Sequence, residues 1–209
     1  EDEQKADDHQ NLVNDAIDRL ASSIDGSSIL GYLQEGFDFD LLSNETIDYL
    51  YINIFQFLNG LIMVMEEIPD DFDVESLSEY VNYTLNEGRN EVKLEMMNFL
   101  LTFCKYSSND NLKDLLDYLG TDVIDSFLLN LGSYDVDVFD SFLDFVESLL
   151  SKIGRFEQES DEITYFLNDA FPKFIDSMLE TDLDEKIEAK TRSIMETYYK
   201  DFNCEEDFG

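Results

Sequence analysis

The chain has 209 residues, which is enough for one sizeable hydrophobic core and does not require two domains. It is 44% hydrophobic and 13% aromatic, which excludes a disordered acidic tail, and its two prolines and nine glycines favour long helices over an all-β design. The formal net charge of −36, from 49 acidic and 13 basic side chains, repels nucleic-acid phosphates and anionic lipids and attracts cationic partners. We therefore expect a helical protein that binds neither nucleic acid nor membranes.

The first 40 residues predict a polar start followed by two helices. Residues 1–10 are almost wholly polar and predict a disordered acidic start. Apolar side chains at helical spacing predict an amphipathic helix over 11–24. The turn at 25–28 can cap a second, short helix over 29–35, and a loop follows at 36–40.

The next segment, 47–65, has the length and apolar character of a membrane span. Polar side chains that include Asp48 and Asn53 interrupt it, and no basic residue flanks it closely. We interpret it as a buried helix of a soluble protein, expected to begin near Asn44 and to end before Pro69.

Shorter helical patterns fill the rest of the chain. They are expected at 74–85, 91–106, 112–119, 123–131, 138–153, 162–167, 171–179 and 184–199. Gly120 is expected to end the helix before it, Pro172 fits the first turn of a helix, and 107–111 is expected to be a loop. We expect one domain over 11–199 and an acidic tail over 200–209.

An internal repeat connects these helices. Leu77, Val81, Leu85, Val92, Met96, Phe99 and Phe103 recur 46 residues later as Val123, Phe127, Leu131, Val138, Phe142, Phe145 and Leu149. Weaker matches at offsets of 45 and 48 residues extend the pattern on either side. The pattern favours a helical repeat array, and the alternative is a non-repetitive bundle whose helices share only their periodicity.

A period near 46 residues with a short, a medium and a long helix resembles the armadillo repeat family, with the HEAT repeats second. The likeness rests on the glycine-led helix at 120–131 and on the long helix with its preceding loop at 133–149. It covers residues 26–199 in about four units. The resemblance implies an all-α, right-handed α-solenoid whose third helices line a concave groove that binds extended peptides.

The resemblance also implies where a partner would bind. In the nuclear import adaptors of this family, a ladder of Trp and Asn holds basic peptides beside acidic residues, but this chain has no Trp. The groove's specificity is therefore left open. The groove positions and neighbouring acids expected to bind the partner are Asn53, Phe57, Glu95, Asn98, Thr102, Asp140, Asp144, Glu147 and Ser148.

The sequence contains no pattern of catalytic or metal-binding residues. Its only histidine, His9, lies in the polar start, and neither Cys104 nor Cys204 has metal-ligand spacing. Glycine-rich phosphate loops and EF-hand spacing are missing as well. We expect no enzyme activity, no cofactor and no metal site. Cys104 is expected to be a core residue, and the cysteine usage favours a cytoplasmic or nucleocytoplasmic protein.

Two functions fit these observations. The first is a monomeric, non-catalytic adaptor or chaperone-like module whose acidic concave surface engages Lys/Arg-rich peptide segments. Exposed ion pairs contribute only about 0–1 kcal/mol each, so such binding needs many contacts and should be sensitive to salt. The second is a structural scaffold fragment of a larger protein that packs through an apolar surface and depends little on salt.

Overall fold

The computed structural model describes residues 44–68, 72–131, 135–154 and 161–200. Regular secondary structure in these ranges is entirely helical, which confirms the expected all-α class. The elements are α3 (Asn44–Met65), α4 (Val74–Glu87), α5 (Asn90–Tyr106), α6 (Asn109–Leu131), α7 (Val136–Ile153), α8 (Asp161–Tyr165), the π-helix η2 (Phe166–Ala170), α9 (Phe171–Leu179) and α10 (Glu185–Tyr198). The polar start, the helices expected at 11–24 and 29–35, and the tail from 201 onward lie outside the described residues.

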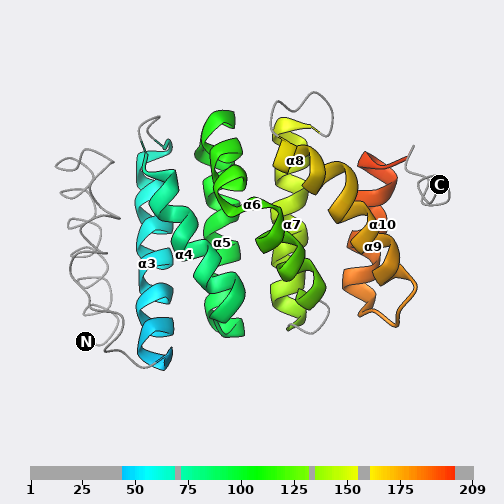
Figure 1. The fold of residues 1–209 in the computed structure, drawn as a ribbon, viewed down its shortest axis with the longest axis horizontal. Coiled ribbons are helices and arrows are strands. Elements are labelled where there is room, and N and C mark those ends of the chain that lie inside the picture. Colours follow the sequence, from blue (N-terminus) through cyan, green and yellow to red (C-terminus); the bar gives the residue numbers. More distant parts are fainter. Residues whose placement is uncertain (1–43, 69–71, 132–134, 155–160, 201–209) are drawn as a thin grey trace, which may run out of the picture.

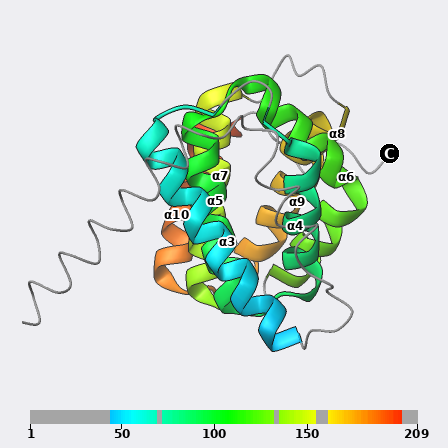
Figure 2. The same ribbon diagram turned by 90° about the vertical axis from the view of Figure 1, so that its left-hand side faces the viewer.

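The helices form two layers (Figures 1 and 2). The first layer contains α3, α5, α7 and α10 side by side, and the second layer contains α4, α6 and the run from α8 through η2 to α9. The helices from α3 to α7 each pack mainly against a helix two places away in the chain, so that α5 lies between α3 and α7, and α10 packs mainly against α7. The chain therefore alternates between the layers as it advances.

Short polar caps fix where several helices begin. The side chains of Asp73, Asp135 and Asp184 each accept a hydrogen bond of 2.9–3.0 Å from a backbone N–H in the first turn of α4, α7 and α10. Pro172 lies in the first turn of α9, as expected, where its missing N–H leaves no hydrogen bond unmade. Each such cap contributes about 1 kcal/mol. Because the cap and its backbone partner are only two or three residues apart, the sequence alone can indicate where such helices begin.

Gly120 separates two helical segments within α6, as expected: its φ of 72° and ψ of 164° are not helical, and the helix axis bends there. The first segment begins at Asn109, inside the loop expected at 107–111. The helices expected at 162–167 and 171–179, by contrast, form one continuous run, in which η2 supplies a wider turn between α8 and α9.

The positions that recur at the 46-residue offset form the core of the molecule. All of them are buried except Val123, which is half-buried. Aromatic contacts connect successive helices within this core: the ring centroids of Phe55 and Phe99 lie 5.6 Å apart, and those of Phe127 and Phe142 lie 5.1 Å apart. The repeating pattern thus marks the faces on which the two layers pack against each other.

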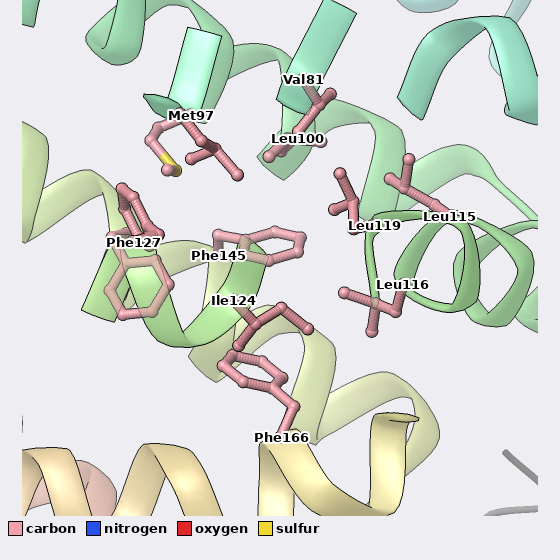
Figure 3. Close-up of a pocket in the computed structure, with 12 residues that line it drawn as sticks. Val81, Met97, Leu100, Leu115, Leu116, Leu119, Ile124, Phe127, Phe145 and Phe166 are labelled. Carbon is pink, nitrogen blue, oxygen red and sulfur yellow. The ribbon is translucent and has the colours of Figure 1, made fainter. Parts of the chain in front are cut away.

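A small apolar cavity of about 40 Å³ remains between the layers (Figure 3). It lies beside the bend in α6, with Leu116 and Leu119 before Gly120 and Ile124 after it. The full lining is Val81, Leu85, Met97, Leu100, Leu115, Leu116, Leu119, Ile124, Phe127, Phe142, Phe145 and Phe166. Because no polar side chain lines it, the cavity offers water no hydrogen bond and stays dry.

The apolar segment at 47–65 forms most of α3. By length and composition alone, the window Thr46–Met65 is the one helix of the described chain that could cross a membrane, and 44% of it is buried within the protein. Asp48 inside this window is buried and forms a 2.5 Å ion pair with Arg89. The pair provides a structural reason for a carboxylate within an apolar helix.

Candidate partner-binding surface

All nine positions predicted to bind a partner lie on three adjacent helices of the first layer. They are Asn53 and Phe57 on α3; Glu95, Asn98 and Thr102 on α5; and Asp140, Asp144, Glu147 and Ser148 on α7. Since α5 lies between α3 and α7, the structure brings the three groups into neighbouring rows (Figure 1). Their side chains, however, have different surroundings.

The polar side chains on α3 and α5 bond mainly within their own helices. The Asn53 amide donates to the Tyr49 carbonyl oxygen at 2.6 Å, and the Thr102 hydroxyl donates to the Asn98 carbonyl oxygen at 3.2 Å. Asn53 and Asn98 are both exposed. Exposed amides of this kind can form hydrogen bonds with the backbone of a bound peptide.

One contact crosses between these two helices. The Gln56 amide donates to a Glu95 carboxylate oxygen at 3.1 Å, which links the exposed sides of α3 and α5. Phe57 is half-buried and packs against the hydrophobic core. Glu95 therefore keeps one hydrogen bond within the chain, whereas Phe57 contributes mainly to packing.

Two of the predicted acids on α7, Asp140 and Asp144, are paired with lysines of α10. Lys190 Nζ lies 2.8 Å from Asp140 Oδ1 and 2.6 Å from Asp144 Oδ1, and it also donates to the Asp140 carbonyl oxygen at 2.8 Å. Lys186 Nζ lies 2.6 Å from Asp140 Oδ2. We call Asp140, Asp144, Lys186 and Lys190 the α7–α10 charge cluster. Sequence reasoning missed the two lysines. Lys186 follows Asp140 by 46 residues, and Lys190 follows Asp144 by the same number, which is the offset of the repeat.

The cluster sets the protonation state of Asp140. Its side chain is only 14% exposed, and burial works to raise its pKa. The hydrogen bonds and positive charges of Lys186 and Lys190 outweigh that effect and hold the Asp140 pKa below its ordinary value. The same hydrogen bond raises the pKa of Lys186. Asp140 therefore stays ionised and joins α7 to α10.

A hollow of about 270 Å³ lies between the N-terminal ends of α5 and α7. Leu94 and Val138 provide its apolar part, and Glu91, Asp135 and Asp137 provide carboxylates. We call it the α5–α7 hollow. Within the described residues, none of its three carboxylates forms an ion pair, and all three side chains are exposed.

These carboxylates also have a structural role. Asp135 caps α7, and Glu91 and Asp137 lie in the first turns of their helices, where negative charge favours the positive end of the helix dipole. Their exposed oxygens can still accept hydrogen bonds from a cation. The hollow therefore combines apolar contact with negative charge, the two properties that a lysine or arginine side chain needs.

Ser148 lies beside a buried thiol and not on an open surface. Cys104 is fully buried, which confirms its expected place in the core. Burial raises the pKa of the Cys104 thiol, although a hydrogen bond with Ser148 and the charge of Lys152 act in the opposite direction. Lys152 Nζ also donates to the Cys104 carbonyl oxygen at 2.7 Å and to that of Ser107, so it caps the end of α5.

Within the described ranges, no group of three or more His, Cys, Asp or Glu side chains is arranged to hold a metal ion. No protein-family model matches this chain, and neither the curated proteins nor the solved structures that were compared with it give a match. The geometry of the described residues is therefore the basis for the functional proposal.

Proposed function

We propose that this chain is a non-catalytic adaptor or chaperone-like module, built as an α-solenoid of the armadillo or HEAT type, that binds Lys/Arg-rich peptide segments on its first layer. The observation that carries the proposal is the α5–α7 hollow, with its carboxylates free of ion pairs in the described chain and its apolar contacts from Leu94 and Val138. The net charge of −36 adds a long-range field that attracts cationic segments.

Two observations support the repeat architecture. The core positions recur at a 46-residue offset, and the helices from α3 to α7 each pack mainly against a helix two places away. Stacked helical repeats have this pattern, because each unit buries its apolar face only against its neighbours.

Binding at the hollow follows from the chemistry of long cationic side chains. The methylene stem of a lysine or arginine can pack on the half-buried Leu94 while its charged head reaches Glu91 and Asp137. Each exposed ion pair contributes only about 0–1 kcal/mol, so one such side chain does not give firm binding. The exposed amides of Asn53 and Asn98 supply further polar contacts along the same layer.

The α7–α10 charge cluster limits where a basic segment can bind. Asp140 and Asp144 already pair with lysines of the chain itself, so a basic peptide would have to displace those lysines to use them. We therefore place the peptide over α3, α5 and the beginning of α7.

The direct test is peptide binding measured by fluorescence anisotropy at about 0.05 M and about 0.5 M NaCl, where screening differs strongly. The probe is a labelled peptide that alternates Lys-Arg pairs with alanines, and its matched comparison carries Glu in place of the basic residues. We expect the basic peptide to bind at low salt, and the double variant Glu91→Gln/Asp137→Asn to weaken it about 5- to 10-fold, as the loss of two ion pairs implies.

The matched control is Asp110→Asn/Asp114→Asn, which removes the same net charge from exposed positions on α6. The control variant should bind nearly as well as the unmodified chain. Equal weakening by the two double variants would show that only the overall charge matters and would overturn the assignment to the hollow. Binding that survives 0.5 M salt unchanged would overturn the electrostatic proposal altogether.

A second candidate function, a scaffold that packs through an apolar surface, is favoured by one observation. Leu129 on α6 is 86% exposed and borders a surface hollow that has further apolar side chains. Such a contact would depend little on salt, so the same titration separates the two functions.

A further inference from the structure

A second hollow lies on the opposite layer, between the last part of α6 and the run from α8 to α9. Its volume is about 400 Å³. Leu128, Leu129 and Phe174 provide apolar surface, and Asp125, Asp169 and Lys173 are its charged residues. We call it the α6–α9 groove.

The apolar part of this groove is only partly covered by the residues that the structure describes. Leu128 is buried and Phe174 is half-buried, but Leu129 is 86% exposed. A single exposed leucine is common on protein surfaces, yet this one borders a hollow that has further apolar side chains. Burying it against another apolar side chain would remove unfavourable contact with water.

The π-helix shapes one wall of the groove. In η2 the Phe171 N–H donates to the Phe166 carbonyl oxygen, five residues earlier, so the turn is wider than in an α-helix. Phe166 and Leu167 from this turn enter the core, whereas Asp169 and Ala170 line the groove. Short π segments inside helices occur frequently at functional sites.

The groove has an excess of negative charge. The Tyr165 hydroxyl lies 2.8 Å from both carboxylate oxygens of Asp125, and this hydrogen bond, together with burial and the nearby charges of Asp169 and Asp122, raises the Tyr165 pKa to about 12. Lys173 is the one cation that lines the groove in the described chain, and it pairs with Asp169 at 2.6 Å. This pair leaves Asp125 as the one lining carboxylate without an ion pair in the described chain, and its negative charge favours a cationic partner.

We propose that the α6–α9 groove is a docking site for an amphipathic helix of another protein, one that places a leucine-like side chain against Leu129 and Phe174 and a lysine or arginine beside Asp125. The hollow lies between helices, where the ridge of side chains on a further helix can fit. The charge complementarity selects a cationic helix and disfavours an acidic one. This site lies on the second layer and is separate from the peptide-binding surface proposed above.

The test uses the fluorescence of a single introduced tryptophan. The chain has no tryptophan, so Ser177→Trp, at an exposed position that lines the groove, introduces a single indole. The probe is an alanine-based helical peptide with leucines at positions i and i+4 and lysines flanking them. One comparison peptide carries Glu in place of Lys, and the other carries Ala in place of Leu.

We expect a saturable change in tryptophan fluorescence with the Leu/Lys peptide and at least tenfold weaker binding of both comparison peptides. Adding Leu129→Asn to the reporter chain should weaken the binding of the Leu/Lys peptide by at least tenfold. The matched control is Met63→Gln on α3, which also removes an exposed apolar side chain and should leave the affinity unchanged. Circular dichroism and thermal melting verify that both variants remain folded.

Three results would overturn this proposal. The first is equal binding of the Glu peptide, and the second is unchanged binding by the Leu129→Asn chain. The third is a concentration-dependent dimer in sedimentation that Leu129→Asn abolishes, which would make a second copy of the chain the occupant. Glu91→Gln/Asp137→Asn should not affect binding at the groove, so the two proposed surfaces can fail independently.

Discussion

Lysine side chains are scarce in this chain, and several of them connect helices. Lys190 joins α10 to two carboxylates of α7, and Lys152 donates to carbonyl oxygens at the end of α5. Lys93 is buried and donates to the Gly88 carbonyl oxygen, and burial lowers its pKa although the charge of Asp48 opposes that effect. With 13 basic side chains against 49 acidic ones, such structural use leaves few cations to neutralise the surface.

We expect Asp140→Asn to destabilise the protein by about 1–3 kcal/mol at neutral pH, because it removes hydrogen bonds between a charged acceptor and two lysines. Urea unfolding followed by circular dichroism measures the difference. The control is Asp114→Asn on α6, an exposed carboxylate that should change the free energy of unfolding by less than about 0.5 kcal/mol. Equal effects of the two variants would contradict a structural role for the charge cluster.

The same variant has a defined pH dependence. Asp140 has a folded-state pKa below its ordinary value of 3.8, so its contribution to stability is fully present above that value. The contribution is lost as the pH falls through the lowered folded-state pKa, because both states then carry the proton. The difference in unfolding free energy between the unmodified chain and Asp140→Asn should therefore be constant near neutral pH and become smaller only below pH 3.8. A difference that narrows already between pH 7 and pH 5 would mean that another group controls it.

At the scale of elements, two glycines carry backbone conformations that other residues rarely adopt. Gly120 has φ 72° and ψ 164°, and Gly154, at the end of α7, has φ 73° and ψ −179°. A Cβ atom added at either position would meet no atom within 4 Å. The requirement for glycine is therefore one of backbone conformation and not of space.

We expect Gly120→Ala to destabilise the protein by about 1–3 kcal/mol, the range for a non-glycine residue in this region of φ and ψ. Asp114→Ala provides the control, since it places alanine in the regular part of the same helix and should be neutral or slightly stabilising. Chemical denaturation of both variants measures the effect. If Gly120→Ala were neutral, the bend in α6 would be dispensable.

The apolar cavity beside that bend gives a prediction of opposite sign. Val81→Ile adds one methylene group at the cavity and should stabilise the protein by about 0.5–1.5 kcal/mol, the reverse of a typical Ile→Val loss. Val146→Ile adds the same group at a fully buried position that does not line the cavity, and should destabilise by about 1–3 kcal/mol through overpacking. The measurement is the midpoint of chemical unfolding, which should rise for Val81→Ile and fall for Val146→Ile. A lower midpoint in both variants would indicate that the cavity cannot accept the added methylene group.

The sequence was sufficient to predict most helix positions, because apolar stripes and caps act locally. Asp135 and Asp184 cap the helices that the patterns indicated, and α9 begins with Pro172 in its first turn. Gly120 interrupts the helical backbone of α6, as the glycine alone predicted. The π-helix was missed, since its wider hydrogen-bonding pattern has no short sequence signature.

The surroundings of the predicted binding residues were harder to foresee than the helices. The helix positions placed these residues on neighbouring helices, but they could not show that Lys186 and Lys190 pair with Asp140 and Asp144. That contact depends on how α10 packs against α7 in space. The sequence contains one hint of this contact: Lys186 and Lys190 lie 46 residues after Asp140 and Asp144, at the offset that relates the apolar positions.

At the scale of the whole molecule, self-repulsion should be the main electrostatic effect on stability. A net charge of −36 opposes the compact state, and salt screens that repulsion. The Debye length falls from about 30 Å at 0.01 M to about 8 Å at 0.15 M ionic strength. Salt also weakens the surface ion pairs, but these contribute little individually.

We therefore expect the melting temperature to rise when NaCl is increased from about 0.01 M to about 0.15 M. Thermal unfolding followed by circular dichroism at fixed pH measures the shift. The control solute is sucrose, which does not screen charge. Its concentration is chosen so that sucrose and NaCl raise the melting temperature of a neutral reference protein equally. A fall in melting temperature with salt would mean that the ion pairs outweigh the repulsion.

The alternation of the chain between layers has a consequence for local stability. Within the described residues α5 and α7 each have a neighbour on both sides in their layer, whereas α10 has only α7. Opening α10 breaks one interface within the first layer, whereas opening α5 or α7 breaks two. Amide hydrogens should therefore exchange with solvent fastest in α10 and slowest in α5 and α7, so that protection is graded along the stack and not uniform.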